Sequence, residues 1–265
     1  MTIRTHIIAV SAAALVLTGL LSGCAGGPED KGQKLAAANA PMTTSTLSLA
    51  KASLASGDLA SAKDLFDQAA NRDPQNLEAR MGQGDVLMLM GETESARLSY
   101  SDTAARFPAA VQPLLALGRV AVAQRRLAQA DQVYGKARLL APQDPRPLQG
   151  LGVSQDLQDH HQDAQVYYRQ ALELRPDDAG VRNDLGLSLA LDGHPRDAIN
   201  MLLDVATAAS APPQARQNLA LAYGMDGNYQ AAESILSAEG DRTMVQNNLV
   251  YYRFLHDRMA QGGTP

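Results

Sequence analysis

The sequence predicts an all-α fold made of stacked helix-turn-helix units, and two spacings carry this prediction. Alanine recurs every 34 residues, and a second small residue recurs with the same period, twelve residues before each of those alanines. A fixed period of this length is typical of arrays in which each unit buries its apolar face against its neighbours. The alanines are Ala62, Ala96, Ala130, Ala164, Ala198 and Ala232, and the small residues are Ala50, Gly84, Gly118, Gly152, Gly186 and Ala220.

Each unit is expected to contain a first helix, a turn, a second helix and a closing turn. Leucine occupies the seventh position in five of the six units, and glycine, which ends a helix in a left-handed conformation at little steric cost, stands in four of the six turns. A large side chain follows each periodic alanine by four residues, one turn along the same helix face. Proline closes the first four units because it cannot continue a helix. The units begin at Thr43, Leu77, Val111, Pro145, Ala179 and Pro213, their turns lie at Gly57, Gly91, Arg125, Asp159, Gly193 and Gly227, and their large residues are Phe66, Tyr100, Tyr134, Tyr168, Leu202 and Leu236.

This recurring pattern of Leu-Gly, Ala, aromatic residue and Pro resembles that of tetratricopeptide repeat proteins over residues 43–240. The resemblance implies an all-α tetratricopeptide repeat solenoid of six helix-turn-helix units plus a C-terminal capping helix. Two features depart from the family pattern. The large residue expected at the fourth position, usually Trp, is absent from every unit, and Ser210 replaces the proline that would close the fifth unit. We therefore expect looser packing and a bend between units five and six.

Residues 1–23 are predicted to be a lipoprotein signal peptide. The apolar run from Ile7 to Leu21 is too short for a durable membrane-spanning helix. It ends in Leu21-Ser22-Gly23-Cys24, which resembles the lipobox of bacterial lipoproteins and holds the chain's single cysteine. The resemblance implies cleavage between Gly23 and Cys24 and lipid attachment to the Cys24 thiol. An ordinary signal peptide with an unrelated cysteine and a retained membrane anchor are the alternatives.

Residues 24–42 are expected to form a flexible tether that starts at the lipidated Cys24, because they are rich in small and polar residues and lack apolar periodicity. Several acyl chains at one cysteine would give durable attachment to a membrane. Ala25 follows the cysteine in place of Asp, which in the resembled lipoproteins favours the outer membrane. The implied location is the periplasmic face of the outer membrane of a Gram-negative bacterium.

The composition argues against several classes of partner. The formal net charge is −5, and loss of Arg4 with the signal peptide would make it −6, so we expect no basic surface for nucleic acid or for anionic lipids. The chain has no Trp and three Phe, which argues against a large aromatic ligand pocket. A length of 265 residues is enough for two globular domains, but the unbroken period favours one elongated domain.

The sequence contains no motif that predicts catalysis, a cofactor or a metal. It lacks G-x-S-x-G, H-E-x-x-H and any pair of cysteines. His160-His161 falls in the turn of the fourth unit without a nearby third ligand, so we expect both to be exposed turn histidines. Asp177-Asp178 stands where the next helix begins, and we expect a helix cap there in preference to catalytic carboxylates. The chain is therefore predicted not to be an enzyme.

The surface left for function is the inner face of the array, which repeats of this kind use for ligands. In the resembled family this face is lined by the second, fifth, ninth and twelfth positions of each first helix. None of the six units has the Lys and Asn pair at the fifth and ninth positions with which some family members clamp a peptide's terminal carboxylate. The mixture of apolar residues and isolated charges suits an amphipathic protein segment, although many of the apolar residues can equally serve packing within the array. The candidates for partner contact are Lys51, Met81, Asp85, Met88, Leu115, Arg119, Val122, Arg146, Gln149 and Asn183.

Residues 241–265 are predicted to be a capping helix and tail. The stretch from Val245 to Arg253 echoes the start of the sixth unit and is not followed by a second helix, as expected of a helix that covers the last apolar face. Together with the lipobox and the repeats, the stretch from Arg216 to Phe254 resembles the tetratricopeptide repeat lipoproteins of tight-adherence (Tad/Flp) pilus assembly, the TadD-like family. The resemblance implies a pilotin-like outer-membrane factor that binds the secretin or another pilus-assembly subunit. A repeat lipoprotein scaffold in outer-membrane-protein or cell-wall assembly is the alternative, and an enzyme with a cryptic site is a third hypothesis.

Overall fold

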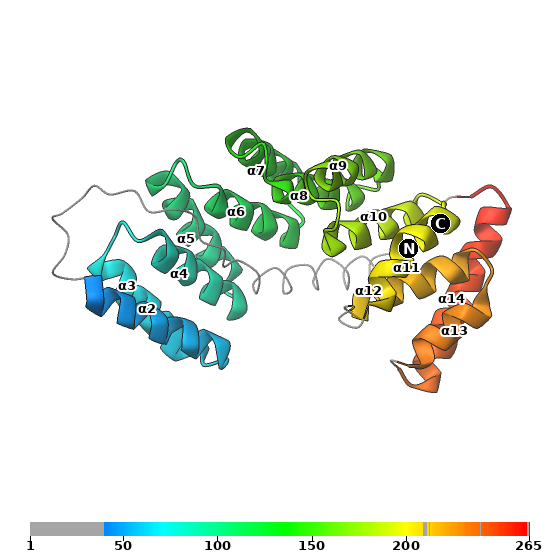
Figure 1. Ribbon diagram of the computed structural model, residues 1–265, viewed down its shortest axis with the longest axis horizontal. Coiled ribbons are helices and arrows are strands. Elements are labelled where there is room, and N and C mark those ends of the chain that lie inside the picture. The colour runs from blue at the N-terminus through cyan, green and yellow to red at the C-terminus, as the bar shows by residue number, and fades with distance from the viewer. Residues whose placement is uncertain (1–39, 209–210, 212, 239, 264) are drawn as a thin grey trace. The chain divides into compact units, whose positions relative to one another are not determined.

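The computed structural model describes residues 40–208, 211, 213–238, 240–263 and 265, which form 13 α-helices and no strand (Figure 1). The all-α prediction is thereby confirmed. Among the described helices, none combines the length and the apolar character that a membrane span needs. The signal peptide, Cys24, the tether up to residue 39, and Ser210 all lie outside the described residues.

The helices pair into six repeats, and the first helices of repeats two to six begin at the predicted residues. In the first repeat the helix begins at Ala40, three residues before the predicted start at Thr43. The first helices are α2 (Ala40–Ala55), α4 (Leu77–Leu89), α6 (Val111–Ala123), α8 (Pro145–Asp156), α10 (Ala179–Leu191) and α12 (Pro213–Met225). The second helices are α3 (Leu59–Arg72), α5 (Thr93–Arg106), α7 (Leu127–Leu140), α9 (His161–Leu174), α11 (Pro195–Thr207) and α13 (Tyr229–Ser237), and α14 (Arg242–Ala260) follows the last repeat.

The described residues divide into two compact units between Leu140 and Ala141. The N-terminal unit contains repeats one to three, and within it α3 packs against α4 and α5 against α6. The C-terminal unit contains repeats four to six with α14, and within it α9 packs against α10, α11 against α12, and α14 against both α12 and α13. Each unit therefore buries apolar surface by stacking successive repeats, which is the packing that the period predicted.

All six predicted turns have left-handed backbone. The φ angles are 81°, 79°, 83° and 86° at Gly57, Gly91, Gly193 and Gly227. The two positions without glycine adopt the same conformation, with φ of 58° at Arg125 and 60° at Asp159. The turn geometry is thus a property of the repeat, and repeats three and four adopt it with side chains that disfavour it.

Glycine at the eighth position of the first helix makes room for the large residue of the second helix. In repeat two, a Cβ added to Gly84 would clash with the Tyr100 ring, so the ring occupies the space that a side chain at residue 84 would need. Tyr134, Tyr168 and Leu202 fill the space beside the corresponding glycines of repeats three to five. The periodic alanines are 0% exposed, which confirms that they permit close approach of the helices.

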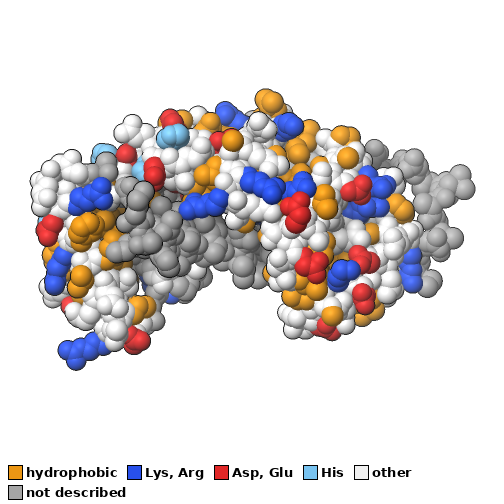
Figure 2. All heavy atoms as spheres, turned by 180° about the vertical axis from the view of Figure 1, so that it is seen from behind, with side chains coloured by type: hydrophobic (Ala, Val, Ile, Leu, Met, Phe, Trp, Pro, Cys, Tyr) orange, Lys and Arg blue, Asp and Glu red, His pale blue; other side chains and the backbone are white. Residues whose placement is uncertain are grey.

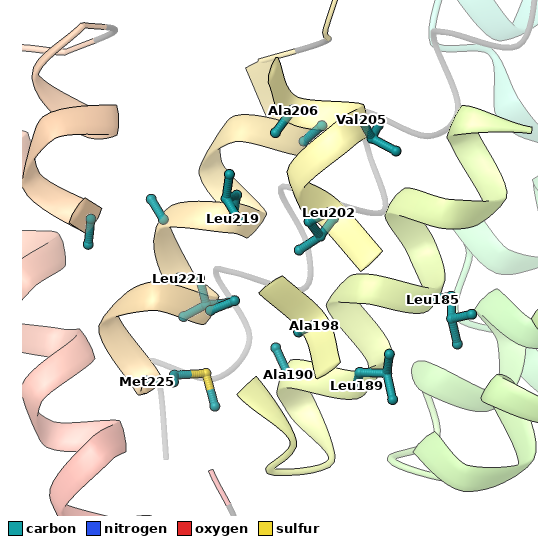
Figure 3. Close-up of a cluster of buried hydrophobic side chains, with 14 of the residues drawn as sticks. Leu185, Leu189, Ala190, Ala198, Leu202, Val205, Ala206, Leu219, Leu221 and Met225 are labelled. Carbon is teal, nitrogen blue, oxygen red and sulfur yellow. The ribbon is translucent and has the colours of Figure 1, made fainter. Parts of the chain in front are cut away.

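The core of the C-terminal unit is continuous from α8 to α14. Figure 3 shows part of it, where side chains of α10, α11 and α12 meet around Leu202 and Leu219. The capping helix α14 buries Leu249 and Tyr252 against this core, and Tyr252 fills the space beside Gly224 as the aromatic residue of a repeat would. The prediction of a capping helix is confirmed.

Candidate partner-binding surface

The first helices of the two units carry different chemistry at the two positions that most directly define the candidate surface. In the N-terminal unit the fifth position is apolar and the ninth is charged, whereas in the C-terminal unit the fifth position is an amide and the ninth is apolar. The fifth positions are Leu47, Met81 and Leu115, followed by Gln149, Asn183 and Gln217. The ninth positions are Lys51, Asp85 and Arg119, followed by Val153, Leu187 and Leu221.

Two of the charged ninth positions of the N-terminal unit already have partners within the chain. Lys51 of α2 forms an ion pair with Glu78 of α4, and both side chains are more than half exposed. The carboxylate of Asp85 accepts a hydrogen bond from the Tyr100 hydroxyl, with 2.6 Å between the oxygens. Burial raises the pKa of Asp85, while the hydrogen bond from Tyr100 and the nearby Arg119 guanidinium oppose that shift.

Arg119 is the third of these charges, and it is half-buried on α6. Its positive charge acts on Asp85, Tyr100 and Tyr134. Among the described residues, however, it takes part in no hydrogen bond and no ion pair.

The apolar candidates of the N-terminal unit divide into buried and half-buried residues. Leu115 and Val122 are 3% and 5% exposed and belong to the core of the described chain. Met81 and Met88 are half-buried and pack against the cluster formed by Ala96, Tyr100, Ala116 and Val120. The methionines thus present part of their surface beside Asp85.

In the C-terminal unit, amide and carboxyl side chains link three successive first helices. Gln149 Nε2 of α8 donates to Asp184 Oδ2 of α10 at 2.8 Å, and Asn218 Nδ2 of α12 donates to Asn183 Oδ1 of α10 at 3.0 Å. The Asn183 amide also lies 3.4 Å from Asp184 Oδ1. Each interhelical bond joins residues 35 positions apart, so it connects the fifth position of one repeat with the sixth of the next.

Asp184 supplies the carboxyl group of this network. It is 4% exposed, and burial raises its pKa to about 7, against the opposing hydrogen bond from Gln149. Among the described residues no Lys or Arg forms an ion pair with it. Gln149 and Asn183 are therefore held by a carboxyl group whose charge state changes near neutral pH.

A second polar cluster surrounds Asp156 at the end of α8. Asp156 Oδ1 lies 2.8 Å from His161 Nδ1 and accepts a hydrogen bond from Ser188 Oγ at 2.7 Å, and Oδ2 accepts one from the Tyr168 hydroxyl at 2.9 Å. Burial raises the pKa of Asp156 despite these three bonds. The expectation that His161 is an exposed turn residue was wrong, because its side chain is only 12% exposed and closes this cluster, whereas His160 is exposed.

The cluster brings Ser, His and Asp side chains together but not in the order that nucleophilic catalysis needs. A catalytic serine hydroxyl donates to a histidine ring nitrogen, which an acid orients from the other side. Here Ser188 Oγ donates to the carboxylate and lies 3.3 Å from the backbone oxygen of His161, and Ser188 is 0% exposed. The cluster therefore ties α8, α9 and α10 together and offers no activated nucleophile to a substrate.

The remaining candidates are occupied locally. Arg146 forms a two-pronged ion pair with Asp144, whose side chain also accepts from the Arg146 backbone N–H at the start of α8. Asp178 caps α10 by accepting from the backbone N–H groups of Gly180 and Val181, as predicted. Among the described residues, no three His, Cys, Asp or Glu side chains gather in a way that could hold a metal ion.

Sequence reasoning missed Asp184 and Asn218, which hold the candidates Gln149 and Asn183, and Ser188, which belongs to the Asp156 cluster. A signal for two of them was present, because the sixth position is Ser, Gly or Ala in the first four repeats and becomes Asp184 and Asn218 in the last two. On the face drawn in Figure 2, basic, acidic and hydrophobic side chains are interspersed.

Two segments of the sequence match models of a known family. Residues 53–108 and residues 146–178 each match a family model described as tetratricopeptide repeat. The sequence matches no curated protein. The matched segments contain part of repeat one, most of repeat two and most of repeat four, in the register derived above.

Solved structures share the fold at low sequence identity. A chain of the APC/C hetero-tetramer Cut9–Hcn1 is 20% identical with a TM-score of 0.70 over 80% of this chain and 43% of that one, so this chain spans less than half its length. TTC0263, a thermophilic tetratricopeptide repeat protein of Thermus thermophilus, is 22% identical with a TM-score of 0.60 over 68% and 98% of the two chains. The structure of pilF of Pseudomonas aeruginosa is 17% identical to this chain, with a TM-score of 0.64 over 84% of this chain and 99% of that one. Repeats of this fold are protein-interaction scaffolds that bind protein partners or peptides.

Proposed function

We propose, from the premise that this chain is a tetratricopeptide repeat protein, that it is a lipid-anchored scaffold for Tad/Flp pilus biogenesis. In this proposal a lipid on Cys24 holds the chain at the periplasmic face of the outer membrane. The first-helix surfaces bind a segment of the secretin or another subunit of the export machine. The chain acts without catalysis and, like a pilotin, helps the secretin pore reach or assemble in the outer membrane.

The observation that carries the proposal is the combination, in one chain, of a lipobox-like Leu21-Ser22-Gly23-Cys24, six repeats and a closing helix. The stretch from Arg216 to Phe254 resembles Tad/Flp pilus lipoproteins and contains most of α12, all of α13 and most of α14. Within this stretch, residue 239 lies outside the described residues. The likeness to pilF of Pseudomonas aeruginosa concerns the fold and adds no argument about function.

The chemistry of the first helices supports a scaffold that holds protein segments. The N-terminal unit offers half-buried methionines beside charged side chains, and the C-terminal unit offers a fixed row of amides. Methionine adapts its shape to varied apolar partners, and amides both donate and accept hydrogen bonds. Both are suited to binding a polypeptide, whereas the Ser188, His161 and Asp156 cluster lacks the geometry of a hydrolase site.

Deletion of the gene tests the proposal directly. We expect loss of surface pili and of secretin multimers from outer-membrane fractions, and recovery of both when the wild-type gene is returned. Unchanged pili and unchanged secretin multimers would refute the pilus assignment. A defect confined to other outer-membrane proteins or to the cell wall would instead assign the scaffold to the alternative assembly system.

A further inference from the structure

Arg119 stands out in the N-terminal unit because it is half-buried and yet donates no hydrogen bond to any described residue. A guanidinium carries five N–H donors in a planar fork that matches a carboxylate. Asp85 interacts electrostatically with Arg119, but its carboxylate accepts a hydrogen bond from Tyr100 and forms no ion pair with Arg119. Arg119 therefore has both the charge and the donors to bind a carboxylate supplied from outside the described chain.

Two apolar side chains of α4, Met81 and Met88, pack against a cluster that includes Ala116 and Val120, which lie on either side of Arg119 in the sequence of α6. Met81, Asp85 and Met88 share one side of α4 because they are separated by four and three residues. Asp85, which interacts electrostatically with Arg119, lies between the two methionines, about one turn from each. Both methionines are half-buried against the core beneath them. We call Met81, Met88 and Arg119 the arginine–methionine patch.

We infer that the arginine–methionine patch binds an amphipathic helix of the partner protein that presents an Asp or Glu between two apolar residues. This inference rests on the proposed function, in that it assumes that the first-helix surface holds a segment of a partner. It adds the chemistry of that segment. The carboxylate pairs with Arg119, and the two apolar residues cover Met81 and Met88.

The spacing of the methionines favours a helix over an extended segment. Seven residues of α4 separate them, which corresponds to about 10 Å along the helix axis. A partner helix spans the same distance between residues seven apart, which lie on one face, with a third residue of that face between them. In an extended strand, two residues that are about 10 Å apart are separated by three positions, so their side chains lie on opposite faces of the strand.

The charge distribution assigns this binding mode to the N-terminal unit. In the C-terminal unit the ninth positions are apolar, and the charge of Arg146 is neutralised by a two-pronged bond to Asp144. A side-chain carboxylate suits the patch better than a chain terminus, because the fifth position of repeat three is the buried Leu115 and supplies no second donor beside Arg119.

Photocrosslinking in cells tests the inference with the full-length lipidated protein. A photoreactive amino acid replaces Gln112, which is exposed on α6 seven residues before Arg119 and leaves the patch intact. Mass spectrometry then maps the captured segment. We expect an acidic residue flanked by apolar residues on one helix face, and a crosslink yield that falls about tenfold in Arg119→Gln and Arg119→Glu. Lys136→Glu, an exposed charge reversal on α7, is the control and should leave the yield unchanged.

A reciprocal change separates loss of recognition from loss of folding. Replacing the acidic residue of the captured segment by Arg should restore the crosslink to Arg119→Glu and weaken it for the wild-type chain. A synthetic peptide of that segment should bind the full-length protein in detergent about tenfold more weakly when its acid is replaced by the amide. Both results support the inference.

The possible failures distinguish the inference from the proposed function. If a secretin segment is captured and both Arg119 variants retain the full yield, or the segment has no acidic residue, the inference is overturned while the pilus assignment stands. If the captured segment shows the Arg119 dependence but belongs to a protein outside pilus assembly, the inference stands and the pilus assignment fails. Absence of any crosslink at Gln112 in cells that assemble pili also overturns the inference.

Discussion

Asp184→Asn should remove a pH dependence of folding stability from the C-terminal unit. Asp184 is 4% exposed, and its pKa is raised from 3.8 to about 7, mainly by burial. The folded state therefore binds a proton more tightly than the unfolded state does. The associated stabilisation is fully present below about pH 4 and is lost as the pH rises through about 7.

The size of the effect follows from the difference between the two pKa values. A change from 3.8 to about 7 corresponds to about 4 kcal/mol of lost stability once the group is ionised in both states. Asparagine resembles the protonated acid but keeps one acceptor for the two amides, Gln149 and Asn183, that approach Asp184. Reorganisation of that hydrogen bond costs about 1 kcal/mol. The variant should thus be about 3 kcal/mol more stable than the wild-type chain above pH 7 and about 1 kcal/mol less stable below about pH 4.

Urea unfolding between about pH 5 and pH 8, followed by circular dichroism, measures this difference, and amide hydrogen exchange in α10 localises it. Every other ionisable group is common to the two proteins and cancels in the comparison. Asp204→Asn is the matched control, because the side chain of Asp204 on α11 is 78% exposed. An Asp184→Asn variant whose unfolding midpoint follows the wild-type pH dependence would refute the reasoning, as would an equal gain in Asp204→Asn.

Other substitutions test the packing, the turns, the polar cluster and the lipid anchor. Gly84→Ala should destabilise the N-terminal unit by about 1–3 kcal/mol because the new Cβ meets the Tyr100 ring. Gly135→Ala on α7, where no neighbouring atom lies within 4 Å of the added Cβ, should stabilise the unit by about 0.5–1 kcal/mol. Similar melting temperatures for the two variants would contradict the conclusion that Gly84 makes room for Tyr100. Asp159→Gly should stabilise the C-terminal unit by about 1 kcal/mol by relieving a φ of 60°, whereas Asp163→Gly within α9 should destabilise it by a similar amount in urea titrations. Tyr168→Phe should lower the unfolding free energy by about 1–3 kcal/mol because Asp156 loses a hydrogen bond. The Tyr134 hydroxyl bonds to no described residue, so Tyr134→Phe should change the unfolding free energy by less than about 0.5 kcal/mol. Equal costs would show that the hydrogen bond to Asp156 contributes nothing. Cys24→Ser should leave unlipidated precursor that no longer sediments with membranes, and normal outer-membrane fractionation of that variant would exclude the lipoprotein assignment.

The helix-turn-helix register was predictable because its determinants are local and repeated six times. Gly57 and Gly91 mark turns by their own conformational preference, and the constant spacing extended the assignment to Arg125 and Asp159, where the residue type alone argues against a left-handed turn. The same spacing placed the starts of five first helices at the observed residues. Repetition therefore supplied information that no single repeat contains.

The sequence predicts which positions of the first helices form the candidate surface, but it does not predict how their side chains interact. The repeat pattern assigns all the candidate residues to one surface. Two of them, Leu115 and Val122, are buried, whereas Arg119 and Met88 are half-buried. Their exposure depends on which side chains of other helices pack against them, which the repeat pattern does not specify. His161 illustrates the same limit, because its position in a turn suggested exposure and its contact with Asp156 removes it from solvent.

The 34-residue period determined the secondary structure, the turns and the pairing of helices, since each depends on residues within one repeat or on its immediate successor. Stacking of the repeats decided which polar groups meet. Gln149 and Asp184 are 35 residues apart, and their bond exists only because α8 and α10 lie side by side. The same stacking left Arg119 without a described partner while Lys51 and Arg146, equally charged in the sequence, found theirs. Charge and spacing are properties of the chain, whereas pairing and burial arise from contacts between distant residues that form together when the repeats pack.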